Sequence, residues 1–174
     1  MGFFRKRMTK TLLVHPQYLG AGLKAHVKNQ ASREAANEGV TDVGYVVTTL
    51  RIPDEGVVSG TIDHLTGSVR FDVTFDAICF KPLRNEVLDA VVQQCTSQGI
   101  FAEAGPFSVF VHSLHVGDLE FRPEDLSWAS SETGVAVRAG AAVRVKIMGV
   151  NTAIGARQIA GIGTINEPFL GLLA

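Results

Sequence analysis

The sequence has little of what would mark a secreted, membrane or disulfide-stabilised protein. Only two cysteines are present, Cys79 and Cys95, and both stand in apolar strand contexts. That setting favours buried free thiols in an intracellular protein over a disulfide or redox pair. No apolar run approaches the ~18 residues that span a bilayer, and the basic residues 1–10 are too short for a secretory signal. We therefore expect no membrane partner.

Net charge is also small, with 16 Lys and Arg against 17 Asp and Glu. This balance excludes a globally basic nucleic-acid binder. Any RNA contact must come from a local patch, so its affinity should be modest and sensitive to salt. Hydrophobic residues make up 46% of the 174 residues, which is enough for the core of one large domain or of two small ones.

Catalytic and metal-binding patterns are missing as well. Of the five histidines, only His112 and His115 are close in sequence, and no cysteine or carboxylate cluster accompanies them, whereas zinc takes about four ligands. There is no nucleophile elbow, phosphate loop or local Ser-His-Asp or Cys-His pattern. Gly155, Gly161 and Gly163 are better explained by curvature of a strand. We expect no enzyme activity, no metal and no cofactor.

The first half of the chain has the pattern of a small α+β unit. A strand is predicted over 3–14, with basic residues along an exposed edge, and a helix is predicted to open near Leu19 or Gly20 and to end before Gly39. Strands over 43–50 and 57–63 are predicted to pair with each other across a turn. Apolar and polar residues alternate over 68–80, which indicates a half-buried strand.

The second half is predicted to consist of strands only. Residues 76–116 are predicted to form a strongly bent meander with turns at 96–99 and 105–106. The strand that enters this meander is predicted to be continuous around Phe80. Further strands are predicted over 141–150 and 157–165. This arrangement is typical of a small closed barrel of the oligonucleotide-binding (OB) type. A polar loop over 122–133 contains Trp128, the one tryptophan, in a setting expected to be solvated.

Three phenylalanines lie close together in this meander: Phe101, Phe107 and Phe110. Alternation buries part of the set in the barrel core and can leave one or two exposed to stack on the bases of single-stranded nucleic acid. The basic residues of the second half either form an RNA-facing edge or are singly solvated, and His112 and His115 are candidates for the same face.

Motifs along the whole chain resemble one family. The core of the resemblance is Cys79-Phe80-Lys81-Pro82-Leu83-Arg84, followed by Glu86-Val87, Gly99-Ile100, Gly105-Pro106 and Val109-Phe110-Val111. Residues 12–20, 143–147 and 161–171 extend it toward both ends. Together they resemble the stalk subunit of RNA polymerase II, its seventh-largest subunit, which has a homologue in the archaeal RNA polymerase. The sequence departs from the family pattern at Asn85 and Ala90, where glycine is usual.

The resemblance implies a truncated RNP-like tip domain over residues 1–80 and an all-β OB-fold RNA-binding domain over 81–174. It implies a non-catalytic nuclear subunit, with shuttling to the cytoplasm left open. Such a subunit forms a heterodimer with the fourth-largest subunit, docks near the clamp of core RNA polymerase II to support transcription initiation, and binds nascent single-stranded RNA. Two alternatives stay open: a stalk subunit of polymerase I or III, and a free-standing RNA-binding module in mRNA decay or translation.

Two sets of site residues follow from the resemblance and the motifs. The RNA-binding set is Lys81, Arg84, Phe101, Phe107, Phe110, His112, Arg144 and Lys146. The set for docking on the core polymerase, expected at one end of the first unit, is Tyr18, Leu19, Gly20, Arg51, Ile52, Pro53 and Gly56.

Overall fold

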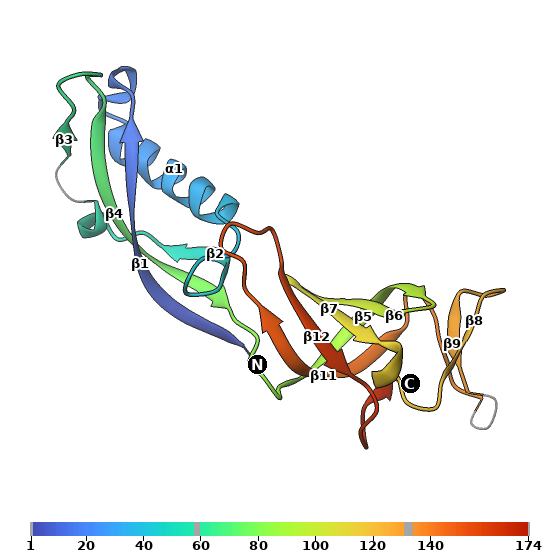
Figure 1. Cartoon of the computed structure of the whole chain (residues 1–174). Helices are drawn as coiled ribbons and strands as arrows, with labels where there is room; N and C mark the ends of the chain where they lie inside the picture. The colour runs from blue at the N-terminus through green and yellow to red at the C-terminus, as the bar shows by residue number, and fades with distance from the viewer. Residues whose placement is uncertain (1, 58–59, 131–133, 174) are drawn as a thin grey trace. The chain divides into compact units, whose positions relative to one another are not determined.

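A computed structural model describes residues 2–57, 60–130 and 134–173 (Figure 1). The chain divides into two compact units, one formed by Phe3–Phe80 and the other by Gly2 with residues 81–173. The described residues are mostly strand, with one α-helix. None of their helices is long and apolar enough to cross a membrane.

The sheet of the first unit is built around its longest strands. β1 (Phe3–Val14) and β4 (Val69–Phe80) pair antiparallel over their whole length, from Phe3 opposite Phe80 to Val14 opposite Val69. β2 (Tyr45–Arg51) and β3 (Thr61–Ile62) pair with the other edge of β4. The prediction that 43–50 and 57–63 pair with each other is therefore wrong. β4 has 12 residues, so one edge is long enough to receive both short strands one after the other.

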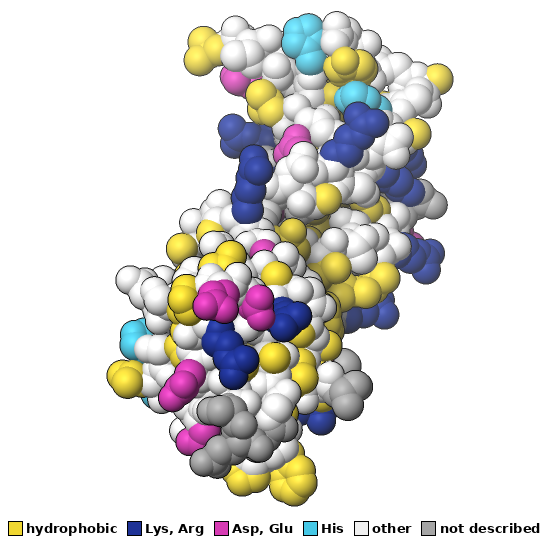
Figure 2. Space-filling view, turned by 90° about the vertical axis from the view of Figure 1, so that its right-hand side faces the viewer, with side chains coloured by type: hydrophobic (Ala, Val, Ile, Leu, Met, Phe, Trp, Pro, Cys, Tyr) yellow, Lys and Arg dark blue, Asp and Glu magenta, His cyan; other side chains and the backbone are white. Residues whose placement is uncertain are grey.

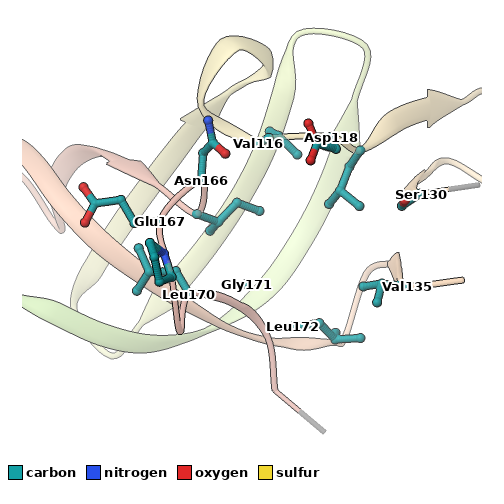
Figure 3. A pocket seen from close by; sticks show the side chains of 13 residues that line it. Val116, Asp118, Ser130, Val135, Asn166, Glu167, Leu170, Gly171 and Leu172 are labelled. Atoms are coloured by element: carbon teal, nitrogen blue, oxygen red, sulfur yellow. The ribbon is translucent and has the colours of Figure 1, made fainter. Parts of the chain in front are cut away.

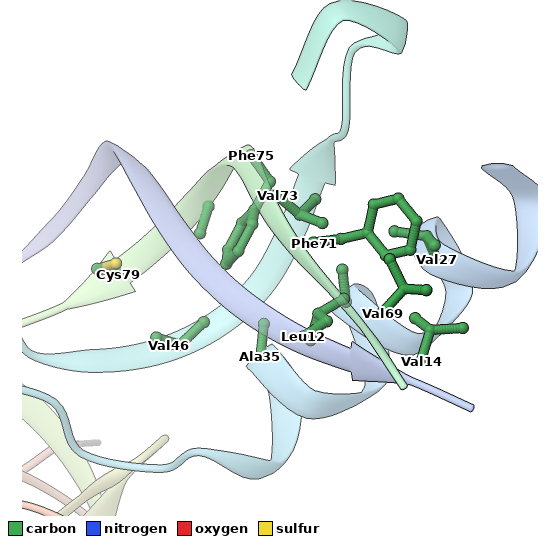
Figure 4. Close-up of a cluster of buried hydrophobic side chains, with 12 residues drawn as sticks. Leu12, Val14, Val27, Ala35, Val46, Val69, Phe71, Val73, Phe75 and Cys79 are labelled. Atoms are coloured by element: carbon green, nitrogen blue, oxygen red, sulfur yellow. The ribbon is translucent and has the colours of Figure 1, made fainter. Parts of the chain in front are cut away.

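The helix α1 (Leu23–Asn37) covers one face of this sheet (Figure 4). Its buried residues Val27, Ala31 and Ala35 recur every fourth position, so they form one stripe along the helix. They pack with β1 and β4 residues such as Leu12, Val14, Phe71 and Phe75. The helix begins later than predicted, since a 3-10 turn, η1 (Pro16–Tyr18), and a bend and turn over 20–22 precede it. It ends before Gly39, as predicted, where φ is +70°. The α+β character is confirmed, and the RNP-like assignment stays a prediction.

Five strands of the second unit close into a barrel. They are β5 (Val87–Thr96), β6 (Gly99–Ala104), β7 (Phe107–His112), β11 (Ala142–Asn151) and β12 (Ile159–Thr164). β5, β6 and β7 form an antiparallel meander, β12 pairs parallel to β7, and β11 joins β12 to β5. This closed pairing is compatible with an OB-like barrel. The short strand β13 (Gly171–Leu172) adds to the edge of β11.

The barrel interior depends on small residues at close contacts. A Cβ at Gly161 would collide with the ring of Phe107, and one at Gly163 would collide with Val145. Both glycines lie in β12, as expected for a strand in a tightly closed barrel. Gly155 instead lies in the turn before β12, with φ at +84°.

The strand predicted to be continuous around Phe80 is interrupted. β4 ends at Phe80 and β5 begins at Val87. Two features of the connecting residues explain the break. Pro82 cannot donate to a strand ladder, and Asn85 has a positive φ of 67°, a conformation that Asn tolerates better than most residues.

The predicted polar loop forms part of a small sheet inserted between β7 and β11. It consists of β8 (Glu120–Arg122), β9 (Ser127–Ala129) and β10 (Ala136–Val137); residues 131–133 of the predicted loop lie outside the described residues. Trp128 is only 4% exposed, so its expected solvated setting is wrong. Its indole N–H donates to the carbonyl oxygen of Thr96 at 3.1 Å, and its ring lies 5.7 Å from that of Phe121. Trp128 therefore packs the insertion onto the end of β5.

Candidate RNA interface and docking surface

Four side chains form a row across the outer surface of the barrel. Gln94 on β5 lies opposite Phe101 on β6, Phe101 lies opposite Phe110 on β7, and Phe110 lies opposite Ile162 on β12. We call these four residues the aromatic row. The ring centroids of Phe101 and Phe110 are 4.6 Å apart, and Phe101 is 40% exposed. The rings of His112 and Phe110 are nearly perpendicular, with their centroids 6.0 Å apart.

Strand alternation puts the row outside the barrel. Ile100 and Ala102 flank Phe101 in sequence, Val109 and Val111 flank Phe110, and all four flanking residues are buried. Successive side chains of a strand point to opposite faces, so the two phenylalanines must face outward. β6 and β7 are the second and third strands of the barrel, which in OB-folds form the ligand-binding face.

The third predicted stacking residue, Phe107, is not available to a ligand. It is 1% exposed and is among the largest fully buried side chains. Its assignment to the RNA-binding set is therefore wrong. Phe107 is the first residue of β7. Its side chain points to the same face of the strand as those of Val109 and Val111, which is the barrel interior.

Two of the predicted RNA-binding cations are held by carboxylates. The guanidinium of Arg144 donates to both oxygens of Asp89, at 2.6 and 2.9 Å. The hydrogen bonds from Arg144 lower the pKa of Asp89, and Asp89 in turn raises the pKa of Arg144. Lys146 donates to both carboxylate oxygens of Glu167 at 2.8 Å. An RNA phosphate would have to compete with these carboxylates.

The structure does not bring the predicted RNA-binding residues together. Arg144 and Lys146 lie on β11, which is separated from β6 by β5 and from β7 by β12. Arg84 is also directed to β11, where its Nε donates to the carbonyl oxygen of Met148 at 2.7 Å. Lys81 is exposed in the connection between β4 and β5. Phe101, Phe110 and His112 therefore form one group, and the cations lie elsewhere.

The charge of the second unit does not favour a nucleic-acid backbone. Residues 81–174 contain seven Lys and Arg against nine Asp and Glu. In the face that Figure 2 shows, carboxylate and cationic side chains of this unit lie side by side, without a continuous basic surface. Contacts with bases, rather than with phosphates, would have to supply most of any RNA affinity.

Exposed apolar side chains gather at one end of the first unit. Tyr18 and Leu19 follow β1 and are more than two-fifths exposed, and Leu65, in the turn before β4, is 96% exposed. We call Tyr18, Leu19 and Leu65 the tip residues. Gly67 lies against Pro16, since a Cβ there would be 3.6 Å from the proline ring. Figure 2 shows hydrophobic and histidine side chains at this end of the unit.

The turn that carries Leu65 is held by Asp63. The carboxylate of Asp63 accepts hydrogen bonds from the backbone N–H of Leu65 at 3.1 Å and from the hydroxyl of Thr66 at 3.0 Å. These hydrogen bonds lower the pKa of Asp63. Sequence reasoning missed Leu65, although a single leucine at the centre of a polar turn was a visible signal.

Tyr18 is held in a similar way. Its ring stacks on that of His26 from α1, with centroids 4.0 Å apart and planes 12° from parallel. A shallow pocket of about 530 Å³ lies beside this pair, lined also by Leu13, His15 and Arg33. Gly20 is exposed nearby in the chain, between η1 and α1.

The other half of the predicted docking set does not lie at this end. Arg51 is opposite Asp76 in β4, seven residues from Val69, which pairs with the end of β1. At ~3.3 Å per residue this separation is about 23 Å. Gly56 packs against the carbonyl oxygen of Thr74, and Ile52 and Pro53 lie between them in sequence. The expectation that both segments share one end of the unit is wrong.

The remaining candidates for chemistry are limited. No group of three His, Cys, Asp or Glu side chains that could hold a metal ion occurs in the described parts of the chain. Cys79 and Cys95 are free and buried, as predicted. Burial raises the pKa of both thiols, so neither is an activated nucleophile.

Comparison with known proteins gives a consistent group of relatives. The chain is 33% identical over 173 residues to DNA-directed RNA polymerase II subunit RPB7 of Glycine max, covering 98% of this chain and 96% of the relative. It is 31% identical to RNA polymerase II subunit rpb7 of Schizosaccharomyces pombe, covering 99% and 100%. RNA polymerase IV subunit 7 of Arabidopsis thaliana is 26% identical over 80% of this chain and 78% of its own length. No protein-family model matches the sequence.

Proposed function

The chain belongs to the family of DNA-directed RNA polymerase II subunit 7, and we propose that it is the non-catalytic stalk subunit of a nuclear RNA polymerase II. The observation that carries the proposal is the full-length match, at 30% to 33% identity, to polymerase II subunits from plants, fungi and Dictyostelium. Similarity that spans the whole chain supports a shared role better than similarity of one module.

In this proposal the tip residues dock on the core polymerase. Tyr18, Leu19 and Leu65 are exposed apolar side chains on segments fixed by Asp63 and His26. Apolar and aromatic side chains at the centre of an interface contribute most to stable association. Contacts near the clamp bias it toward the closed state only by the difference in free energy between closed and open contacts. Arg51, Ile52, Pro53 and Gly56 would form a separate contact.

The aromatic row is the proposed contact for nascent single-stranded RNA. The exposed ring of Phe101 and the half-buried ring of Phe110 offer stacking surfaces, and Gln94 and His112 beside them offer hydrogen bonds to base edges. Arg144 and Lys146 would contribute only after releasing their carboxylate partners. The expected binding is weak and has a shallow salt dependence.

The proposed obligate partner is the fourth-largest polymerase subunit, with which the chain would form a heterodimer. Among paralogues, polymerase II is favoured because the polymerase IV relative is less similar and is matched over a smaller part of the chain. A stalk subunit of polymerase I or III and a free-standing RNA-binding module are the alternatives.

A tagged purification from native cells tests the proposal. We expect the wild-type chain to recover the polymerase II catalytic subunits together with one small partner, identified by mass spectrometry. The variant Leu65→Asp should lose the catalytic subunits, because the leucine is almost fully exposed and its replacement by aspartate would place a charge in an apolar contact.

The matched control is Leu126→Asp, which changes an exposed leucine in the turn between β8 and β9. This variant should recover the polymerase as well as the wild type does. Recovery of ribosomal or decay factors alone would favour the free-standing module. Recovery of polymerase I or III catalytic subunits would reassign the paralogue.

A further inference from the structure

Phe169 stands in a turn that disfavours a large side chain. The N–H of Leu170 donates to the carbonyl oxygen of Glu167 at 3.2 Å. Pro168 and Phe169 are the two central residues, and Phe169 has a φ of +67°. A proline followed by a positive φ is the pattern of a type II turn, in which glycine or asparagine is preferred at the second position. The ring is nevertheless 94% exposed.

The turn is fixed on both sides. Before it, both carboxylate oxygens of Glu167 accept hydrogen bonds from Lys146 of β11. After it, Gly171 and Leu172 pair with β11 as β13, and the N–H of Leu173 donates to Ala142. Phe169 is therefore presented by an ordered turn. A strained backbone and an exposed aromatic ring at one residue suggest a functional role, because neither is favourable for folding.

A groove of about 650 Å³ adjoins this turn, since Glu167, Pro168 and Leu170 line it whereas Phe169 does not (Figure 3). It lies between the C-terminal segment and the segments around Val116 and Val135. Its apolar lining consists of Val116, Leu119, Val135, Ile165, Pro168, Leu170 and Leu172, and none of its lining residues is Lys or Arg. Asp118 and Glu167 line it, and the exposed Glu120 follows in sequence.

The groove also borders a free strand edge. Among the residues that the structure describes, β13 pairs only with β11, on one side. Because antiparallel pairing alternates and the neighbouring Leu173 bonds to β11, the N–H and C=O of Leu172 point away from β11. An edge of this kind can accept one more strand from another chain.

We propose that Phe169 and this groove form a docking site for an extended segment of a partner protein, carrying alternate apolar residues and Lys or Arg. The partner would bury the ring of Phe169 in its own apolar pocket and place its strand beside β13. The acidic side chains Asp118 and Glu120 would attract its cations. RNA is disfavoured here, because the carboxylates repel phosphate and no cation lines the groove.

This inference goes beyond the proposed function, since it uses neither the tip residues nor the aromatic row. An aromatic residue that anchors an interface typically accounts for a large part of the affinity. The same residue contributes little to the fold when it is exposed. Binding and stability should therefore respond in different ways to its removal.

The test begins with cross-linking. The change Phe169→p-benzoylphenylalanine keeps an aromatic ring and allows photo-cross-linking of the tagged full-length chain in its native assembly. We expect one polypeptide to be cross-linked.

That polypeptide is then purified and titrated with the wild-type chain and with the Phe169→Gly variant. We expect the glycine variant to bind about 30-fold more weakly, with a thermal midpoint in Trp128 fluorescence that is unchanged or higher, because glycine adopts positive φ without strain.

Leu126 supplies a matched control. It also has a positive φ, 48°, and is 61% exposed. Leu126→Gly should leave the affinity for the cross-linked polypeptide within twofold of the wild-type value.

The proposal is overturned by cross-links only to RNA, only to a second copy of this chain, or to no macromolecule. It is also overturned if Phe169→Gly binds within twofold of wild type, or if it lowers the thermal midpoint and so reveals a structural role. Loss of polymerase by Leu65→Asp is a separate result and does not bear on these outcomes.

Discussion

The two units expose their apolar side chains in different places. In the first unit the turns at one end expose Tyr18, Leu19 and Leu65, and the strands expose further residues such as Phe3, Leu13 and Leu50. In the barrel, Phe101, Phe110 and Ile162 lie across the strands themselves. The turns of the first unit offer single exposed apolar side chains, whereas neighbouring strands of a closed barrel place side chains in a row across its outer surface.

Their ion pairs differ as well. In the first unit, Asp76 accepts hydrogen bonds from both Arg5 and Arg7, at 2.7 and 3.1 Å, while its own side chain is 8% exposed. One carboxylate thus orients two cations and leaves a net positive charge. In the barrel, Arg144 and Lys146 each have their own carboxylate. A surplus of positive charge is therefore found on β1, where the sequence predicted basic residues along an exposed edge, and the cations of β11 do not form one.

The chain contains separate reporters for the two units. Trp128, the only tryptophan, lies in the second unit, and α1, the one α-helix of the described residues, lies in the first. Tryptophan fluorescence and helical circular dichroism can therefore follow the units separately. A change in one signal and not in the other would show that the units unfold separately, and coincident changes would indicate that both units unfold together.

The largest effect is expected from Phe107→Ala. Removing this fully buried ring leaves a cavity in the barrel core and should cost about 3 to 5 kcal/mol of unfolding free energy. Urea unfolding followed by Trp128 fluorescence measures the loss. The helical signal of the first unit should change less. A fluorescence midpoint equal to that of the wild type would contradict the placement of Phe107 in the core.

An intermediate effect is expected from the double change Phe101→Ala and Phe110→Ala. Stacking contributes ~1 to 3 kcal/mol per base, so affinity for single-stranded RNA should fall roughly 5- to 150-fold for each base that loses its stacking partner. Fluorescence anisotropy with a labelled oligonucleotide measures it. Val91→Ala, which changes an exposed residue of β5, is the control. Equal affinity of the double variant and the wild type would remove the aromatic row from the RNA-binding face.

The smallest effect is expected from acid titration. Hydrogen bonds from Arg5 and Arg7 lower the pKa of Asp76, and Arg144 lowers that of Asp89. A carboxylate with a lowered folded-state pKa stabilises the fold above its unfolded pKa of about 3.9, and this contribution is lost as pH falls through the folded-state value. Asp76→Asn should flatten the acid loss of the helical signal, and Asp89→Asn that of the Trp128 signal. Identical effects on both signals would mean that the units are not independent.

Much of the architecture could be predicted from local patterns. Alternation identified β4 and the barrel meander, and the spacing of Val27 and Ala31 identified α1. The strand pairing in the first unit was not predicted, since β2 and β3 both pair with β4 and not with each other. The candidate site was found only in part: alternation left open which of Phe101, Phe107 and Phe110 face outward, and the closed barrel excluded Phe107.

Most of the strands, the helix and the family could be read from the sequence alone, because periodicity and motifs are properties of neighbouring residues. Which side chains are free to act depends instead on tertiary packing. Lys146 is occupied by Glu167, 21 positions away, and Trp128 is buried against Thr96, 32 positions away. Partners so distant in the chain are set by how strands close into a barrel, and no local pattern carries that information.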